Sequence, residues 1–130
     1  MKAAICILTV ILAVPALAHH SRPVFYVMDQ IISVTGVVVQ VQIINPHSKF
    51  DFEVTEPDGK KTLWRASTHS GSALARAGFS SIKPIAVGDK ITFEGNPARD
   101  QNAKGMLINN FILPSGQKLC YPFTKPCGEK

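Results

Sequence analysis

Hydrophobic and polar residues alternate along several short stretches of the chain, and this period of two predicts β-strands. In the first stretch the apolar residues stand at even numbers before Gly36, at Ile32 and Val34, and at odd numbers after it, from Val37 to Ile43. A one-residue change of phase at a glycine is typical of a β-bulge. We therefore expect a long first strand that bends at Gly36 and places the odd-numbered valines on one face.

Further alternation and turn signals predict four more strands and one short helix. The strands are expected at residues 49–54 and 62–67, after the turn at residues 87–89, and at residues 106–113. The helix is expected between Ser70 and Gly78, because Ser70 or Ser72 can cap its start and glycine suits the position past its end. This order matches an all-β fold with one short helix, a small five-stranded OB-like barrel. Another small antiparallel barrel or sandwich is the alternative.

The amino-terminal segment has the composition of a secretory signal peptide. Lys2 supplies a positive charge, an apolar run follows, and the small residues Ala16 and Ala18 stand at the cleavage positions. The run is too short for a membrane helix, which needs about 20 apolar residues. We expect cleavage between Ala18 and His19, a periplasmic or secreted mature protein, and no membrane span within it.

The chain then divides into four segments. Residues 1–18 are the signal peptide, residues 19–30 a lead-in, residues 31–116 the barrel and residues 117–130 a tail. The lead-in is expected to be extended, because Pro23 opposes a helix. The tail holds Cys120 and Cys127, which are expected to form a disulfide in an oxidising compartment. A metal or redox dithiol is the alternative, but six intervening residues fit neither a C-x-x-C pattern nor a compact zinc hook.

Charge and motifs narrow the function classes only in part. The net charge of +5 is spread along the chain, so an anionic partner is only weakly indicated. The sequence contains no G-x-S-x-G nucleophile elbow, no H-E-x-x-H motif and no glycine-rich phosphate loop. The sequence therefore leans against an enzyme.

The candidate chemistry lies in four histidines, His19, His20, His47 and His69. After cleavage His19 would carry a free amine beside its own imidazole, and both nitrogens can bind one metal ion. An imidazole from His47 would complete the three-nitrogen arrangement of a histidine brace, with His69 in reserve and His20 as a further ligand. Copper is the expected metal and zinc the second. The structural alternative is a solvated terminus, a turn stabilised by His47 and a helix capped by His69.

A metal-free binding module is the second hypothesis. OB barrels bind oligonucleotides or oligosaccharides on their second and third strands and the adjacent loops. In that region an aromatic ring stands among cations, which suits a ligand that stacks and carries negative charge. The residues concerned are Lys49, Lys61, Trp64 and Arg65. Secretion argues against a nucleic acid, so the expected partner is a periplasmic glycan, peptide or protein.

Several short motifs, in their order along the chain, resemble a known family. They are His19-His20-Ser21, Val34-Thr35-Gly36, Ile44-Asn45-Pro46-His47, Asp58-Gly59-Lys60, Trp64, residues 74–79, Val87-Gly88-Asp89, residues 95–100 and Leu113-Pro114-Ser115-Gly116. The chain resembles a family of small secreted bacterial proteins of unknown function, domain-of-unknown-function family 6152. The resemblance implies secretion, a small β-barrel and a Gram-negative periplasmic setting, and it implies no reaction. The chain departs from that family in two places. An aromatic residue often follows the Asn-Pro-His turn in the family, whereas Ser48 and Lys49 follow it here. The tail that holds Cys120 and Cys127 is an extension beyond the family pattern.

Overall fold

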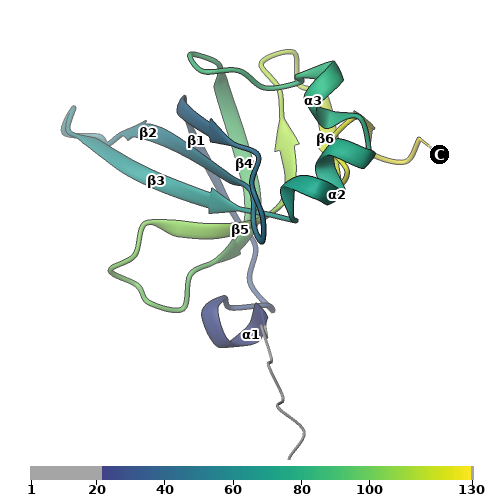
Figure 1. Cartoon of the computed structure of the whole chain (residues 1–130). Helices are drawn as coiled ribbons and strands as arrows, with labels where there is room; N and C mark the ends of the chain where they lie inside the picture. Colours follow the sequence, from purple (N-terminus) through teal and green to yellow (C-terminus); the bar gives the residue numbers. More distant parts are fainter. Residues whose placement is uncertain (1–21, 130) are drawn as a thin grey trace, which may run out of the picture.

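Five strands close into a barrel in the computed structural model, which describes residues 22–129 (Figure 1). The elements are α1 (Arg22–Phe25), β1 (Ile32–Gln42), β2 (Lys49–Thr55), β3 (Lys61–Ser67), α2 (Gly71–Arg76), α3 (Phe79–Ile82), β4 (Lys90–Pro97), β5 (Gly105–Ile112), β6 (Lys118–Cys120) and β7 (Lys125–Pro126). The strands pair in the order β3-β2-β1-β4-β5, and β5 returns to pair in parallel with β3. The predicted five-stranded OB-like barrel is confirmed, with β6 and β7 added beyond β5.

Phenylalanine side chains fill the barrel. Phe50 and Phe52 of β2, Phe93 of β4 and Phe111 of β5 are fully buried. The rings of Phe52 and Phe93 stack with centroids 4.1 Å apart, and Phe50 meets Phe111 edge to face at 5.2 Å. Burial of one such side chain contributes about 1.5–3 kcal/mol. The predicted alternation in β2 therefore places two of these phenylalanines in the hydrophobic core.

The carboxy-terminal tail packs onto this core. Phe123 is fully buried, and its ring centroid lies 4.5 Å from that of Phe111. Cys120 and Cys127 lie at disulfide distance, with Cα atoms 4.9 Å apart, as expected from the sequence. The tail is therefore part of the folded unit, and the cross-link closes the short loop that presents Phe123.

The bend of the first strand lies at Val39 rather than at Gly36. The pairing of β1 with β2 skips one residue between Val38 and Gln40, so Val39 is the bulged residue. Val38 is 1% exposed, whereas Val37 and Val39 are 40% and 39% exposed. The predicted position of the bulge was wrong because three successive valines conceal the residue at which the phase changes.

Three short helices occur among the described residues, where one was predicted. The predicted helix is α2, and Gly78, whose φ of 87° is left-handed, lies just past its end as expected, whereas α3 begins beyond that glycine. Ser70 caps α2, and its hydroxyl accepts from the backbone N–H of Ala73 at 3.2 Å. α1 lies in the lead-in that was expected to be extended, since proline is tolerated in a first helical turn. Within residues 22–129, no helix has the length and apolar composition to cross a membrane.

The lead-in is bound to the end of β4 and the residues after it. Asn96 is 3% exposed, and its Nδ2 amide lies 2.7 Å from the carbonyl oxygen of Gln30 and 3.1 Å from that of Met28. The guanidinium of Arg99 donates to the carbonyl of Pro23 at 2.9 and 3.1 Å. These contacts hold the start of the described chain in one position on the barrel.

Acid is expected to weaken the contact between β4 and the tail. The carboxylate oxygen Oε2 of Glu94 lies 2.6 Å from the ammonium nitrogen of Lys118. The side-chain amide of Asn110 also donates to this oxygen. The hydrogen bonds from Lys118 and Asn110 lower the pKa of Glu94 below its ordinary value of 4.5. Because the folded state favours the ionised carboxylate, this stabilisation is present above about pH 4.5 and is lost as the pH falls through the lowered pKa.

Glu94→Gln should therefore lower the free energy of unfolding by about 1 kcal/mol at neutral pH and by little at about pH 3. Urea unfolding of both proteins across this pH range measures the difference. A gap that stays constant with pH would show that the ionised carboxylate is not the cause.

Candidate functional site

The turn that carries His47 is joined by hydrogen bonds to the segment that carries His69. The backbone N–H of Ser48 donates to the carbonyl of His69 at 2.9 Å. The side-chain oxygen of Asn45 accepts from the backbone N–H of Ser72 at 3.0 Å. The Asn-Pro-His turn and the start of α2 therefore form one unit, which brings the two histidines to the same end of the barrel.

His69 is held between an aromatic ring and a cation. Its imidazole stacks on Tyr121 with ring centroids 3.8 Å apart, and its Nε2 lies 3.3 Å from Nη2 of Arg22. Its Nδ1 lies 3.3 Å from the hydroxyl of Thr68. Burial lowers the pKa of His69, and the charges of Arg22 and His47 lower it further. The lowered pKa favours the neutral imidazole, the form that binds a metal ion.

We call His47, His69 and Arg22 the histidine corner. A pocket of about 340 Å³ opens beside it, between α1 and the barrel. Its lining consists of Arg22, Phe25, Tyr26, His47, Lys49, Ser67, Thr68 and Leu107. This lining contains two permanent cations and no carboxylate, so a metal ion bound at the corner would gain from an anionic co-ligand.

The four predicted metal ligands are divided by the limits of the structure. His19 and His20 lie outside the described residues, whereas His47 and His69 lie together at the corner. Residues 22–129 by themselves contain no group of three His, Cys, Asp or Glu side chains that could hold a metal ion. Ser70 rather than His69 caps α2, so that structural role for His69 is excluded.

The four residues of the metal-free hypothesis lie in three different places. Trp64 packs toward the barrel interior, where it stacks on Phe52 with centroids 6.3 Å apart. Lys61 and Arg65 lie on the opposite face of β3 and pair with carboxylates of β2 at 2.9 and 2.7 Å. Lys49 lines the pocket at the histidine corner. Strand alternation thus places Trp64 on the face of β3 opposite Lys61 and Arg65.

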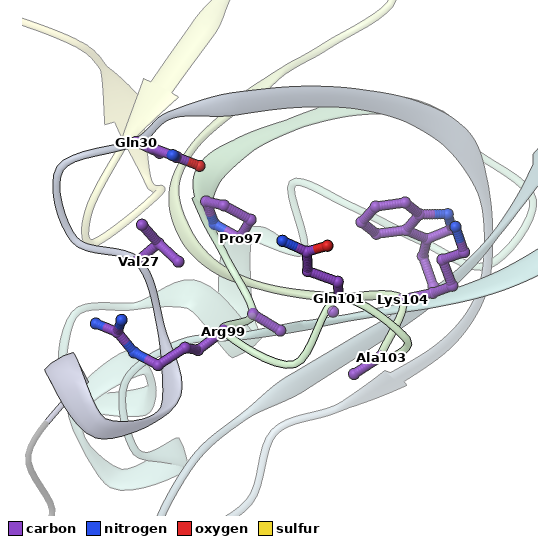
Figure 2. Close-up of a pocket in the computed structure, with 10 residues that line it drawn as sticks. Val27, Gln30, Pro97, Arg99, Gln101, Ala103 and Lys104 are labelled. Atoms are coloured by element: carbon purple, nitrogen blue, oxygen red, sulfur yellow. The ribbon is translucent and has the colours of Figure 1, made fainter.

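A second pocket, of about 250 Å³, lies beside Trp64 (Figure 2). It is lined by the lead-in, β3 and the loop between β4 and β5, and it includes Gln30, Arg99, Gln101 and Lys104. The ammonium of Lys104 lies 5.6 Å from the centre of the Trp64 ring. Sequence reasoning missed these loop residues, because a polar loop between strands has no periodicity that shows which way its side chains point.

Comparison with known proteins gives a family and a fold. A family model described as a family of unknown function (DUF6152) matches residues 7–109, and no curated protein matches the chain. A crystal structure of the mitochondrial single-stranded DNA binding protein Rim1 from S. cerevisiae is similar with a TM-score of 0.50 and 12% identity, over 65% of this chain and 92% of that chain. A second crystal form has a TM-score of 0.48 and 10% identity, over 65% and 94%. At such identity the likeness concerns the barrel fold alone.

Proposed function

The chain belongs to this family of unknown function (DUF6152). On the basis of the histidine corner, we propose that it is an exported metal-handling protein that binds Cu(II). The ligands would be the amine and imidazole of an amino-terminal His19 together with His69 and His47, and His20 would assist. Zinc would bind less tightly, as the ordinary order of affinities for nitrogen ligands requires.

The observation that carries this proposal is the position of Arg22. Its guanidinium lies 3.3 Å from Nε2 of His69, so the described chain starts beside the corner. His19 precedes Arg22 by three residues, and three residues span at most about 10 Å. On this proposal an amino-terminal His19 would share one metal ion with His69 and with His47, which lines the same pocket as Arg22.

The metal-free module is the weaker proposal for this protein. A stacking glycan or peptide would need an open aromatic face, whereas Trp64 packs on Phe52 and Lys104 already lies over its ring, and the neighbouring Arg65 is paired with Asp51. The histidine corner needs no such rearrangement of strands. A metal ion bound to Nε2 of His69 would displace Arg22 from that nitrogen.

Calorimetry with Cu(II) tests the proposal on protein shown by mass spectrometry to begin at His19. An extension of three residues ahead of His19 should weaken binding by about 100-fold, or about 2.7 kcal/mol, because it removes the amine from the ligand set. Shorter extensions are unsuitable, because a histidine in second or third place chelates Cu(II) through the amine and backbone amides without any folded partner.

Variants at the histidine corner distinguish copper binding by the folded protein from copper binding by the amino-terminal residues alone. His69→Asn and His47→Asn should reduce the affinity toward that of a free peptide of residues 19–26. Arg22→Gln should raise it by roughly tenfold, because a cation that repels Cu(II) is removed. Equal affinity of the extended and unextended proteins, or of the intact protein and the peptide, would overturn the proposal.

A further inference from the structure

A row of three paired residues crosses the outer face of the barrel beside the histidine corner. Lys49 of β2 pairs with Ser67 of β3, and Ser67 pairs in turn with Leu107 of β5. Residues paired across neighbouring strands project from the same face of a sheet. The adjoining pair, Phe50 and Ala66, is fully buried in the core, so the row faces away from the core. All three residues of the row line the pocket of about 340 Å³.

Apolar side chains form much of the wall of this pocket. Leu107 is only 8% exposed although it lies on the outer face of the barrel. Phe25 and Tyr26 of the lead-in line the pocket with it. Phe25 is 61% exposed, so its aromatic surface is open to solvent and to a ligand. The pocket therefore suits a molecule with an apolar part.

The charges at the pocket specify the polar part of that molecule. Arg22 and Lys49 belong to the lining, which contains no carboxylate. Neither cation is paired with a carboxylate among the residues that the structure describes. Asp51, the next acidic side chain on that face of β2, is already held by Arg65 through two hydrogen bonds of 2.7 Å. Because cations without a counter-charge attract anions, the pocket favours a negatively charged group.

We propose that this pocket binds a small carboxylate with an apolar body, of the arylalkyl class. Arg22 and Lys49 bind the carboxylate, for which a guanidinium has matching geometry. The apolar body packs on Phe25 and Leu107. The volume admits a molecule at the lower end of the range for ligand pockets, with a single ring and a short chain. The site needs no metal ion, so it does not rest on the proposed copper binding.

An NMR titration of metal-free protein with phenylpropionate at constant ionic strength tests the ligand class. Saturable binding is expected, with a dissociation constant of about 1 mM. Phenylpropanol keeps the apolar body without the charge, and acetate keeps the charge without the apolar body. Each should bind at least about tenfold more weakly, since each loses one of the two contacts. Equal affinity for either compound would overturn the proposal.

Two variants with matched controls locate the ligand. Phe25→Ala should weaken binding by about fivefold or more, because apolar contact is lost. Its control is Val24→Ala, since Val24 is also 61% exposed in α1 but does not line the pocket. Lys49→Met should weaken binding by about tenfold, and its control is Lys61→Met, since Lys61 is paired with Glu53. Unchanged affinity in Phe25→Ala or Lys49→Met, or an equal loss in its control, would place the ligand elsewhere and contradict the site.

Arg22→Gln separates this inference from the copper proposal. Carboxylate binding should weaken by about tenfold, because a cation of the pocket is lost. Copper binding should become tighter in the same variant, as stated above. Unchanged carboxylate affinity in Arg22→Gln would overturn the inference and leave the copper proposal standing. Carboxylate binding that behaves as expected in protein that binds no copper would support the inference and contradict the copper proposal.

Discussion

Replacement of Gly95 by alanine is expected to prevent the barrel from closing and to leave little folded protein. A Cβ atom there would overlap the carbonyl oxygen of Leu107 in β5 and lie 2.8 Å from its carbonyl carbon. The register of β4 and β5 shifts between Glu94 and Gly95, so this is a bulge at which two backbones approach closely. Because both obstructing atoms belong to the backbone, no rotamer change can relieve the overlap.

The expected cost exceeds about 4 kcal/mol, a large part of the stability of a small domain. Circular dichroism and urea unfolding measure it. Gly105→Ala is the matched control, because a Cβ at that position would lie 3.5 Å from the carbonyl oxygen of Arg65 and 3.7 Å from Cβ of Ala98, in ordinary contact. Unfolding of Gly95→Ala within about 1 kcal/mol of the parent protein would show that β4 and β5 lie farther apart than described.

Replacement of Asn96 by alanine is expected to release the lead-in from the barrel. The amide of this buried side chain lies within hydrogen-bond distance of the carbonyl oxygens of Val27, Met28 and Gln30, at 3.4, 3.1 and 2.7 Å. Its loss leaves these carbonyls without their partner and opens a polar cavity. We expect a loss of about 3 kcal/mol in the free energy of unfolding.

Hydrogen exchange distinguishes release of the lead-in from general destabilisation. The N–H of Val27 donates to Pro97 and the N–H of Arg99 donates to Phe25, so both should exchange faster in Asn96→Ala than the amides of β2. On the proposed function, copper affinity should fall as well, because Arg22 would no longer fix the point at the histidine corner from which His19 would bind the metal ion. Asn102→Ala, at an exposed loop position, should change neither property. Unaltered exchange at Val27 would show that Asn96 does not hold the lead-in.

Strand identity was predictable wherever polar and apolar residues alternate without ambiguity. Phe50 and Phe52 are separated by the polar Asp51, and both are fully buried as expected. The bulge of β1 was not predictable to the residue, because Val37, Val38 and Val39 are all apolar and any of them could face the core. Gly36, where the bulge was expected, instead lies so close to β2 that a Cβ would be 2.6 Å from the carbonyl oxygen of Glu53.

The sequence pointed to histidines as the candidate residues, but it did not show how they are arranged at the histidine corner. His47 was expected in the loop between the first two strands, where it lies, but the sequence left His69 in reserve. The hydrogen bonds from Ser48 to His69 and from Ser72 to Asn45 make the two histidines part of one corner. The sequence likewise placed Trp64 and Arg65 in one candidate group, which alternation along β3 separates.

By itself the sequence determined the strands, the order that closes them into a barrel and the cysteine pair. These follow from neighbouring residues, since each strand shows its two faces within a few positions. Only the tertiary structure decided that Arg22 meets His69, that Asn96 holds the lead-in and that Lys104 covers Trp64. Those contacts join segments up to 69 residues apart, as Asn96 and Val27 are, and no local pattern carries that information because closure of the barrel creates the proximity.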